Sequence, residues 1–212
     1  PGLIKRLLAG EIVALVSDAG TPLVSDPGYK LVREAVDAGI TVYPLPGASS
    51  VLAALAVAGL PSDRFLFAGF LPPRQAARRS ELHELVNIKA SLVFLESAKR
   101  LAASLADMVF VLGDREAAVC RELTKLYEEV RRGSLADLAA HYAEAGAPKG
   151  EIVIVTGPPV GNHQVLDVDA ALKELLVDHS VKEAAALIAA KSGLPKREVY
   201  ARALVLTGSG KT

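Results

Sequence analysis

Two loops rich in glycine, proline and hydroxyl residues are the first places in this sequence where ligand chemistry is expected. The longer loop runs from Asp18 to Gly28 (DAGTPLVSDPG), and the shorter one covers residues 46–50 (PGASS). Glycines allow the backbone to approach a ligand closely, and hydroxyl groups and free amides can hydrogen-bond it. Asp18 and Asp26 supply carboxylates that can hold a ribose diol or an ammonium group. The longer loop therefore predicts a site for a polar ligand.

The shorter loop places small residues and hydroxyls at the start of a predicted helix. Free backbone N–H groups and the helix dipole favour a carboxylate at such a position. A nucleoside amino acid would satisfy both loops, with its ribose and ammonium at one and its carboxylate at the other. The alternative is that Ser49 only caps the helix and that the glycines and prolines only form turns. Neither loop matches a glycine-rich phosphate motif, so no phosphate cradle is predicted.

A third group of candidate residues lies between Cys120 and Glu129 (CRELTKLYEE). Charges of both signs crowd the end of a predicted strand and indicate a hydrogen-bond network, with a solvated helix as the alternative. The charged and polar members are Arg121, Glu122, Thr124, Lys125, Glu128 and Glu129. Cys120 itself is expected to be a small core residue. The four histidines show no metal-ligand spacing, so no metal is expected.

Basic residues cluster locally, although the chain carries 24 basic and 24 acidic residues in total. Such clusters can neutralise the phosphates of a nucleic acid. Solvated helix faces explain the same pattern, and both interpretations stay open. The clusters are Arg74 with Arg78 and Arg79 on one predicted helix face, Lys99 with Arg100, and Arg131 with Arg132.

The first two loops need strands and helices to position them, and the sequence predicts an α/β arrangement. Apolar runs at 11–17, 40–43 and 65–70 are typical of buried strands, and helices are predicted over 29–37 and 50–58. The alternation of strand, loop and helix favours a parallel sheet with helical crossovers. In open α/β sheets, ligands bind beyond the carboxyl ends of the strands, where both loops are expected.

A second α/β unit is predicted after Leu71-Pro-Pro73, a linker candidate because two prolines stop regular pairing. Beyond Asp167 the pattern is helical only, with breaks near His179 and at Gly193-Leu-Pro195, which is helix-turn-helix spacing. Lys196 and Arg197 at the last helix start either contact phosphate or belong to a packing or dimerisation surface. The unit is predicted to contain helices 75–87, 98–107 and 134–145 and strands 91–95, 117–121 and 151–156.

Composition limits the class of protein. Of the 212 residues 51% are hydrophobic but only 5% are aromatic and none is Trp, so an aliphatic α/β core is expected. No apolar run reaches the roughly 20 residues of a membrane span. The single cysteine excludes an internal disulfide framework, and a cytoplasmic location is predicted. The chain has no initiating Met, and it is expected to lack an N-terminal part.

Taken together, these segments resemble the ribosomal RNA small-subunit methyltransferase I family, a branch of the tetrapyrrole methylase superfamily. The resemblance spans essentially the whole chain, and the first and fourth of its segments are specific to this branch. The segments are 16–28 (VSDAGTPLVSDPG), 44–50 (PLPGASS), 67–72 (FAGFLP), 121–125 (RELTK) with Glu128-Glu129, 149–153 (KGEIV) and the tail from Lys182 to Leu204.

The resemblance implies a two-domain tetrapyrrole-methylase-like fold with parallel or mixed sheets, here divided as 1–71 and 74–160, and a helical tail at 165–212. It also implies a homodimer that uses S-adenosylmethionine to methylate a cytidine 2′-hydroxyl in small-subunit (16S) ribosomal RNA. The implied donor pocket consists of Asp18, Gly20, Thr21, Pro22, Ser25, Ala48 and Ser49, with Phe67, Gly69, Phe70, Gly150, Glu151 and Ile152 as its walls. The predicted RNA-binding residues are Arg74, Arg78, Arg79, Arg100, Lys196 and Arg197.

The chain departs from the family pattern at several points. Family members begin with a further strand and glycine-rich loop, followed by an acidic-threonine-arginine segment, which stand before the position of Pro1. Residues 96–100 read ESAKR, where the family typically has Pro and His in place of Ala98 and Lys99. Tyr127 replaces a more usual histidine. The absent segment is expected to have supplied part of the donor pocket, and the residues at 98 and 99 weaken any catalytic assignment to the turn at residues 96–100.

Methyl transfer to a ribose hydroxyl requires alignment, a dry pocket and removal of the hydroxyl proton. The catalytic hypothesis is that Glu122 or Glu96 accepts the proton, while Lys125 or Arg121 stabilises the alkoxide. Two other functions stay open: a precorrin-type tetrapyrrole methylase, and a non-catalytic dimeric RNA-binding module.

Overall fold

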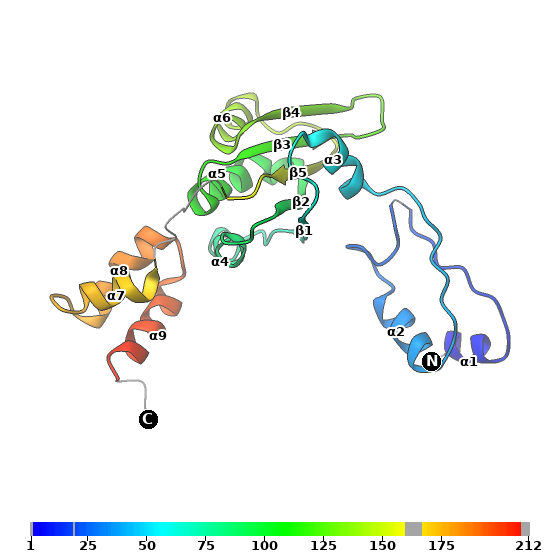
Figure 1. Cartoon of the computed structure of the whole chain (residues 1–212), viewed down its shortest axis with the longest axis horizontal. Coiled ribbons are helices and arrows are strands. Elements are labelled where there is room, and N and C mark those ends of the chain that lie inside the picture. The colour runs from blue at the N-terminus through cyan, green and yellow to red at the C-terminus, as the bar shows by residue number, and fades with distance from the viewer. Residues whose placement is uncertain (1, 19, 160–166, 209–212) are drawn as a thin grey trace. The chain divides into compact units, whose positions relative to one another are not determined.

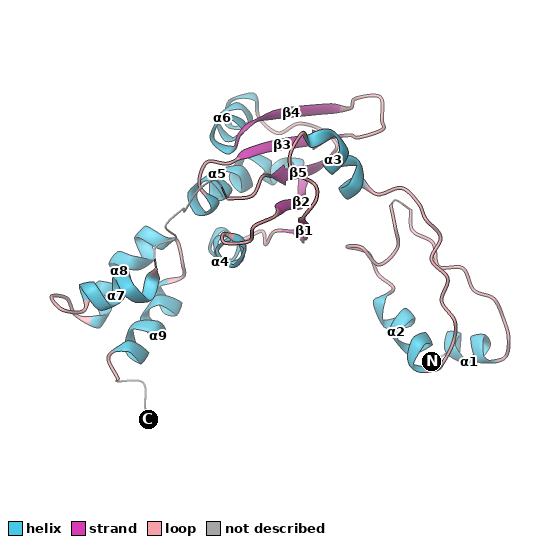
Figure 2. Ribbon diagram, viewed as in Figure 1, coloured by secondary structure: helices cyan, strands magenta, loops and turns pink. Residues whose placement is uncertain are grey.

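The computed structural model of the chain describes residues 2–18, 20–159 and 167–208 (Figures 1 and 2). Contacts within the chain divide it into two compact units, Pro1–Ala53 and Ala54–Thr212. The first unit contains the two predicted ligand loops, and the second contains a five-stranded sheet and the helical tail. The domain division predicted from the sequence, at residues 71–74 and 160–165, stays a prediction.

The first unit contains α1 (Gly2–Leu8), α2 (Tyr29–Asp37) and the first turn of α3 (Ser50–Ala58). Residues 11–17 and 40–43, predicted as strands, form no strand and are drawn as loops in Figure 2. Ile12 is 99% exposed. These two strand predictions are wrong because a strand needs ladder partners, and neither segment pairs with a strand within the described residues.

The second unit is built on a mixed sheet in the order β1-β2-β5-β3-β4 (Figure 1). β1 and β2 pair in parallel, whereas β2 with β5, β5 with β3, and β3 with β4 pair antiparallel. The predicted α/β class is confirmed, with most strand pairs antiparallel. The strands are β1 (Phe65–Phe70), β2 (Ser91–Ser97), β3 (Glu116–Arg121), β4 (Glu129–Ser134) and β5 (Glu151–Thr156).

β4 was not predicted, because its sequence EVRRGS carries three charges and no run of apolar residues. It forms an antiparallel hairpin with β3 and lies at one edge of the sheet. Edge strands tolerate charged residues, which also discourage pairing with another chain. Arg131 and Arg132, adjacent basic residues in the sequence, therefore lie on an edge strand.

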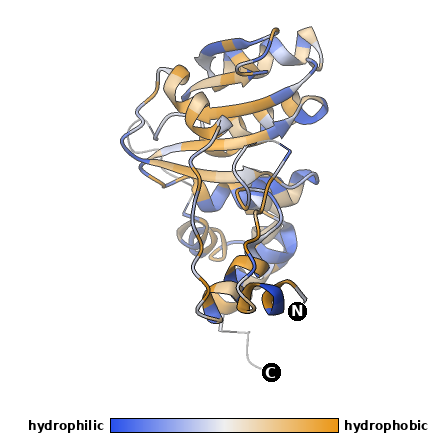
Figure 3. Ribbon diagram, turned by 90° about the vertical axis from the view of Figure 1, so that its right-hand side faces the viewer, coloured by the Kyte–Doolittle hydropathy of each residue, from blue (hydrophilic) through white to orange (hydrophobic). Residues whose placement is uncertain are grey.

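Three helices, α4 (Gln75–Leu85), α5 (Leu101–Leu112) and α6 (Leu135–Ala145), contribute side chains to one core cluster with the sheet. Leu92 and Phe94 on β2 and Ile154 on β5 are fully buried in this cluster. The sheet strands are predominantly apolar in Figure 3. The alternate residues of β3 and β5, such as Cys120 and Val155, are also buried, so the sheet is covered on both faces.

Cys120 is expected to resist thiol-modifying reagents in the folded protein. Its side chain is 1% exposed, and burial raises the pKa of its thiol from 9.0 to about 11. At pH 8 this shift alone lowers the thiolate fraction about 100-fold, and the thiolate is the reactive form. Alkylation by iodoacetamide, followed by mass spectrometry, should proceed in denaturant and be negligible without it. Rapid labelling of the native protein would contradict the assigned burial of β3.

The proline linker is held by a buried and a partly buried arginine. The Arg78 guanidinium, 4% exposed, donates to the Pro73 carbonyl at 3.1 Å, and Arg100 donates to the Leu71 carbonyl at 3.0 Å. Arg78 also forms an ion pair of 2.6 Å with Asp107 on α5, which is 1% exposed. These bonds hold the chain between β1 and α4 in one conformation.

The tail consists of α7 (Val168–Leu175), α8 (Val181–Ser192) and α9 (Lys196–Leu206) around a small core of its own. Ser180 and Glu183 form a reciprocal capping box at the start of α8. Gly193 ends α8 with φ +73°, and a side chain there would collide with the Phe110 ring. His83 on α4 contacts the Ser192 carbonyl. The predicted helices and both breaks are confirmed.

Candidate functional site

The two predicted ligand loops lie against each other within the first unit. The Thr21 hydroxyl donates a hydrogen bond of 3.2 Å to the carbonyl of Ala48. Gly20 faces the same carbonyl, since a Cβ built on it would lie 4.0 Å from that oxygen. Leu23 and Ser25 adopt positive φ angles of 75° and 56°, so the longer loop folds back tightly. Residues that are 27 positions apart in sequence thus form one loop cluster.

Ser49 caps α3, as the alternative interpretation of the shorter loop required. Its hydroxyl accepts a hydrogen bond of 3.4 Å from the amide of Leu52. A helix start that is capped in this way still presents other free N–H groups, which favour an anion. Asp18 and Thr21 are exposed, and Ser49 is partly exposed. The cluster therefore offers a carboxylate, hydroxyls and amides to a polar ligand.

The other predicted donor-binding residues lie on two strands of the second unit. Gly69, with φ +70°, accompanies a register shift in β1 opposite β2. Phe67 is partly buried there, and Phe70 at the end of the strand is 54% exposed. Gly150 precedes β5, and Ile152 within it is buried. These residues stay a prediction as donor contacts.

The segment between β3 and β4 forms a tight turn in which Glu122 and Thr124 adopt left-handed backbone conformations, with φ 49° and 64°. Non-glycine residues in this region are uncommon and are concentrated at functional sites. The Glu122 amide donates to the carbonyl of Glu151 at 3.0 Å, and its carboxylate accepts from the Glu151 amide at 2.8 Å. The turn is therefore fastened to the start of β5 by the backbone and by a side chain.

Gly150 is the residue that makes room for Glu122. Its φ is +105°, and a Cβ at this position would lie 2.4 Å from Glu122 Cγ. An L-residue would be strained by the backbone angle and would also collide with the carboxylate-bearing side chain. Glycine is thus required here for two separate reasons.

Lys125 completes a charged cluster at this turn. Its ammonium lies 2.9 Å from a Glu122 oxygen and 3.0 Å from a Glu151 oxygen. The hydrogen bond from the Glu151 amide, and then the one from Lys125, lowers the pKa of Glu122. Hydrogen bonds to Glu122 and Glu151 raise the pKa of Lys125, which stays protonated. A carboxylate with a lowered pKa is a weak general base, because the same hydrogen bonds favour the ionised form of Glu122 over uptake of a proton.

Glu96, the second candidate base, is 3% exposed and engaged on several sides. It accepts hydrogen bonds from the Ser97 amide at 2.6 Å and the Ser104 hydroxyl at 2.5 Å, and it pairs with Arg100 at 2.6 Å. A carboxylate with these partners connects β2 to α5 and has no free face for a proton from a substrate. Glu96 is therefore left out of the catalytic proposal.

The predicted RNA-binding arginines do not form one surface. Arg78 is buried on Asp107, and Arg79 pairs with the same carboxylate and lies 4.0 Å over the Phe110 ring. Arg100 is committed to Glu96 and to the linker. These three hold helices together and are left out of the proposed RNA surface. Arg74, Lys196 and Arg197 are exposed and stay candidates.

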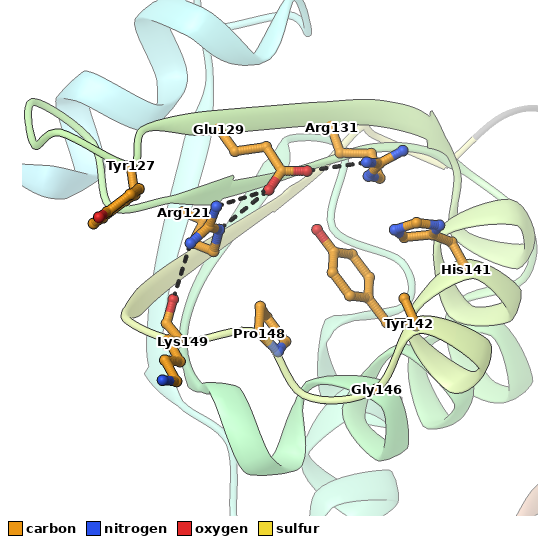
Figure 4. A pocket seen from close by; sticks show the side chains of 10 residues that line it. Arg121, Tyr127, Glu129, Arg131, His141, Tyr142, Gly146, Pro148 and Lys149 are labelled. Atoms are coloured by element: carbon orange, nitrogen blue, oxygen red, sulfur yellow. Dashed lines mark hydrogen bonds and ion pairs between the residues drawn. The ribbon is translucent and has the colours of Figure 1, made fainter.

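A concavity that the sequence analysis did not identify adjoins the turn (Figure 4). Its volume is about 560 Å³, and it lies between β3, β4, the end of α6 and the following loop. Arg121 donates to Glu129 and to the Lys149 carbonyl there. Recognising β4 as a strand would have placed Arg131 beside Arg121. The lining residues are Arg121, Tyr127, Glu129, Arg131, His141, Tyr142, Ala145, Gly146, Pro148 and Lys149.

Neither a metal-binding cluster nor a membrane-spanning helix is found among the described residues. No group of three or more histidine, cysteine or acidic side chains there is arranged to hold a metal ion. Among the same residues, no helix combines the length and apolar character needed to cross a bilayer.

Comparison with known proteins matches most of the chain to the family that its sequence motifs resemble. The tetrapyrrole (corrin/porphyrin) methylase family matches residues 2–139, and the RsmI C-terminal HTH domain matches residues 163–207. The chain is 51% identical to the ribosomal RNA small subunit methyltransferase I of Mesorhizobium japonicum over 208 residues. That match covers 97% of this chain and 71% of the relative.

Two further comparisons agree with this result. The enzyme of the same name from Pseudomonas aeruginosa is 46% identical over 211 residues, which cover 97% of this chain and 75% of the relative. The crystal structure of the methyltransferase CobJ aligns with a TM-score of 0.54 at 19% identity, covering 74% of this chain and 69% of that one. The second likeness shows a shared fold alone.

Proposed function

The chain belongs to the ribosomal RNA small subunit methyltransferase I family, and from this premise we propose that it methylates a cytidine 2′-hydroxyl in 16S ribosomal RNA with S-adenosylmethionine as donor. The observation that carries the proposal is the hydrogen bond between Thr21 and Ala48, which holds both ligand loops together. The exposed residues Arg74, Lys196 and Arg197 are proposed to contact RNA. A cytoplasmic homodimer is part of the same proposal.

The loop cluster has the functional groups that this donor requires. Asp18 is proposed to take the ammonium or the ribose hydroxyls, and the start of α3 is proposed to take the carboxylate. Gly20 leaves space beside the Ala48 carbonyl, where a larger residue would approach it. The remaining predicted contacts are Pro22, Ser25 and Ser49 from the same loops, and Phe67, Gly69, Phe70, Gly150, Glu151 and Ile152 from the second unit.

The charged turn is proposed to act on the nucleophile. The donor supplies a methyl group on a sulfonium; its C–S bond breaks as the ribose oxygen forms the new C–O bond and releases its proton. Lys125 and Arg121 are proposed to stabilise the developing alkoxide electrostatically. Glu122 is proposed to position Lys125 and, as the remaining candidate base, to receive the proton that the hydroxyl releases.

The proposal is tested by donor binding and methyl transfer in Thr21→Val. Loss of the hydroxyl removes the bond that joins the loops, and we expect about 10-fold weaker S-adenosylmethionine binding by calorimetry. Thr41→Val, an exposed threonine of the same unit, is the matched control and should bind as the parent does. Transfer of labelled methyl to purified small subunits, but not to a tetrapyrrole acid, identifies the substrate class. A parent protein that neither binds the donor nor labels small subunits would contradict the proposal.

A further inference from the structure

The concavity beside the charged turn carries an excess of positive charge. Arg121, Arg131 and Lys149 line it against one carboxylate, Glu129, which bridges the two guanidinium groups at 3.1 and 3.0 Å. Burial raises the pKa of Glu129, but hydrogen bonds from Arg121 and Arg131 outweigh this effect and lower it. Glu129 therefore stays ionised and holds both arginines in place. Cations that are fixed in this way favour a bound anion.

Only some of the cationic hydrogen-bond donors that line the concavity are occupied by partners within the protein. Each of the three guanidinium nitrogens of Arg121 has a partner, since two lie against Glu129 and the third donates to the Lys149 carbonyl at 3.2 Å. Arg131, 42% exposed, makes one ion pair, with Glu129. The Lys149 ammonium pairs with no carboxylate among the described residues. Arg131 and Lys149 are thus the cations with capacity for a ligand.

Tyr142 provides an independent sign of a ligand. The residue is 4% exposed, and its hydroxyl makes no hydrogen bond of normal geometry among the described residues; burial raises the pKa of Tyr142 overall, although the nearby Arg131 guanidinium lowers it. Figure 4 shows this hydroxyl pointing into the space beside Glu129 and Arg131. A buried hydroxyl without a partner is unfavourable and is rare in folded proteins. An oxygen of a bound phosphate beside Arg131 would satisfy it.

Aromatic surface lies at the rim of the same concavity. Tyr127 is 68% exposed and presents a flat aromatic ring. His141 and Pro148 also line the space. Exposed rings next to cations are the arrangement with which proteins bind unpaired nucleotides, by stacking bases and neutralising phosphates.

We infer that this concavity is a nucleotide subsite of the RNA substrate, in which Arg131, Lys149 and the Tyr142 hydroxyl hold a phosphodiester and Tyr127 stacks on the adjoining base. The inference rests on the proposed function for its choice of RNA. Arg121 belongs to both the subsite and the charged turn, so a nucleotide held here would be next to the group that is methylated. A protein partner on the same surface is the competing explanation.

The subsite is tested by the binding of a fluorescein-labelled, single-stranded RNA of mixed sequence to the whole chain. Tyr142→Phe should unfold at the same urea concentration as the parent or a higher one, because the lost hydroxyl makes no hydrogen bond of normal geometry, yet bind RNA about 5-fold more weakly. Arg131→Gln should bind about 10-fold more weakly at low salt. For this variant, the slope of log affinity against log salt concentration should be smaller in magnitude by about 0.7, the value for one phosphate contact of a single strand.

Controls separate this inference from the proposed function. Arg33→Gln removes an exposed arginine that also pairs with a carboxylate, and it should bind RNA as the parent does. Tyr127→Ala should weaken binding without changing the salt slope. Parental RNA affinity in Arg131→Gln and Tyr142→Phe would overturn the subsite, and so would a changed oligomeric state in ultracentrifugation with RNA binding unaffected. Donor binding and methylation by the parent are measured separately, so their failure counts only against the proposed function.

Discussion

Replacing Asp107 by alanine is expected to lower the free energy of unfolding by about 3–5 kcal/mol, the range found when one partner of a buried ion pair is removed. Asp107 is 1% exposed and pairs with Arg78 and Arg79 at 2.6 Å each. Without it, the buried Arg78 guanidinium keeps only the carbonyl oxygens of the linker. The uncompensated charge is the source of the cost. Urea unfolding followed by circular dichroism measures the difference.

The matched control for the Asp107→Ala substitution is Glu198→Ala. Glu198 pairs with Arg202 on the exposed face of α9 at 3.0 Å, and exposed helix pairs contribute about 0.3–0.5 kcal/mol. The two substitutions each remove one carboxylate from one ion pair or network, but they differ in burial. Equal losses of stability in both variants would show that the Arg78–Asp107 pair is not buried as described.

Gly150→Ala is expected to reduce methyl transfer to small subunits about 100-fold. The new methyl group would lie within 2.4 Å of Glu122, so that side chain must leave the Glu151 amide and Lys125. Loss of one preorganised electrostatic contact costs catalysis on the order of 100-fold. The positive φ adds roughly 1–3 kcal/mol of strain, which is measured separately by urea unfolding. Initial rates with labelled donor give the activity.

Three further variants separate the effect of backbone strain from that of the collision with Glu122. Gly39 also has a positive φ, 73°, but nothing lies within 4 Å of its added Cβ, so Gly39→Ala reports backbone strain alone. Glu122→Ala should lose activity to a similar extent, and the double variant Gly150→Ala with Glu122→Ala should lose little more. If the fold losses of activity of the two single variants multiply in the double variant, Gly150 acts through something other than Glu122.

Much of the second unit could be predicted because its elements are encoded locally. Helices α4 and α6 and strands β1, β2, β3 and β5 follow from apolar periodicity, and the tail breaks follow from Gly193 and Pro195. β4 could not be found in this way, because the hairpin with β3 forms it from a charged sequence. The direction of strand pairing could not be predicted either, because an apolar run has the same pattern in parallel and antiparallel sheets.

The runs at 11–17 and 40–43 show the opposite failure. Each has the apolar composition of a buried strand, yet neither is a strand in the structure. Strand formation depends on a partner that supplies hydrogen bonds, and composition cannot provide one. The local sequence therefore indicated that these segments are apolar enough to be buried. It did not determine whether they are buried in the structure.

By itself, the sequence determined the family, the α/β class and the helix break at Gly193, and it predicted ligand chemistry for the two loops. These follow from residue type and local backbone demands. Only the tertiary structure brought Thr21 to Ala48 and placed Gly150 against Glu122. It also separated Arg78, Arg79 and Arg100, whose carboxylate partners are buried, from Arg131, whose partner Glu129 is partly exposed. Which charge finds which partner depends on contacts between residues that are distant in sequence. Burial of the carboxylate then makes such a pairing costly to break, and this cost distinguishes the structural arginines from Arg131, whose partner is partly exposed.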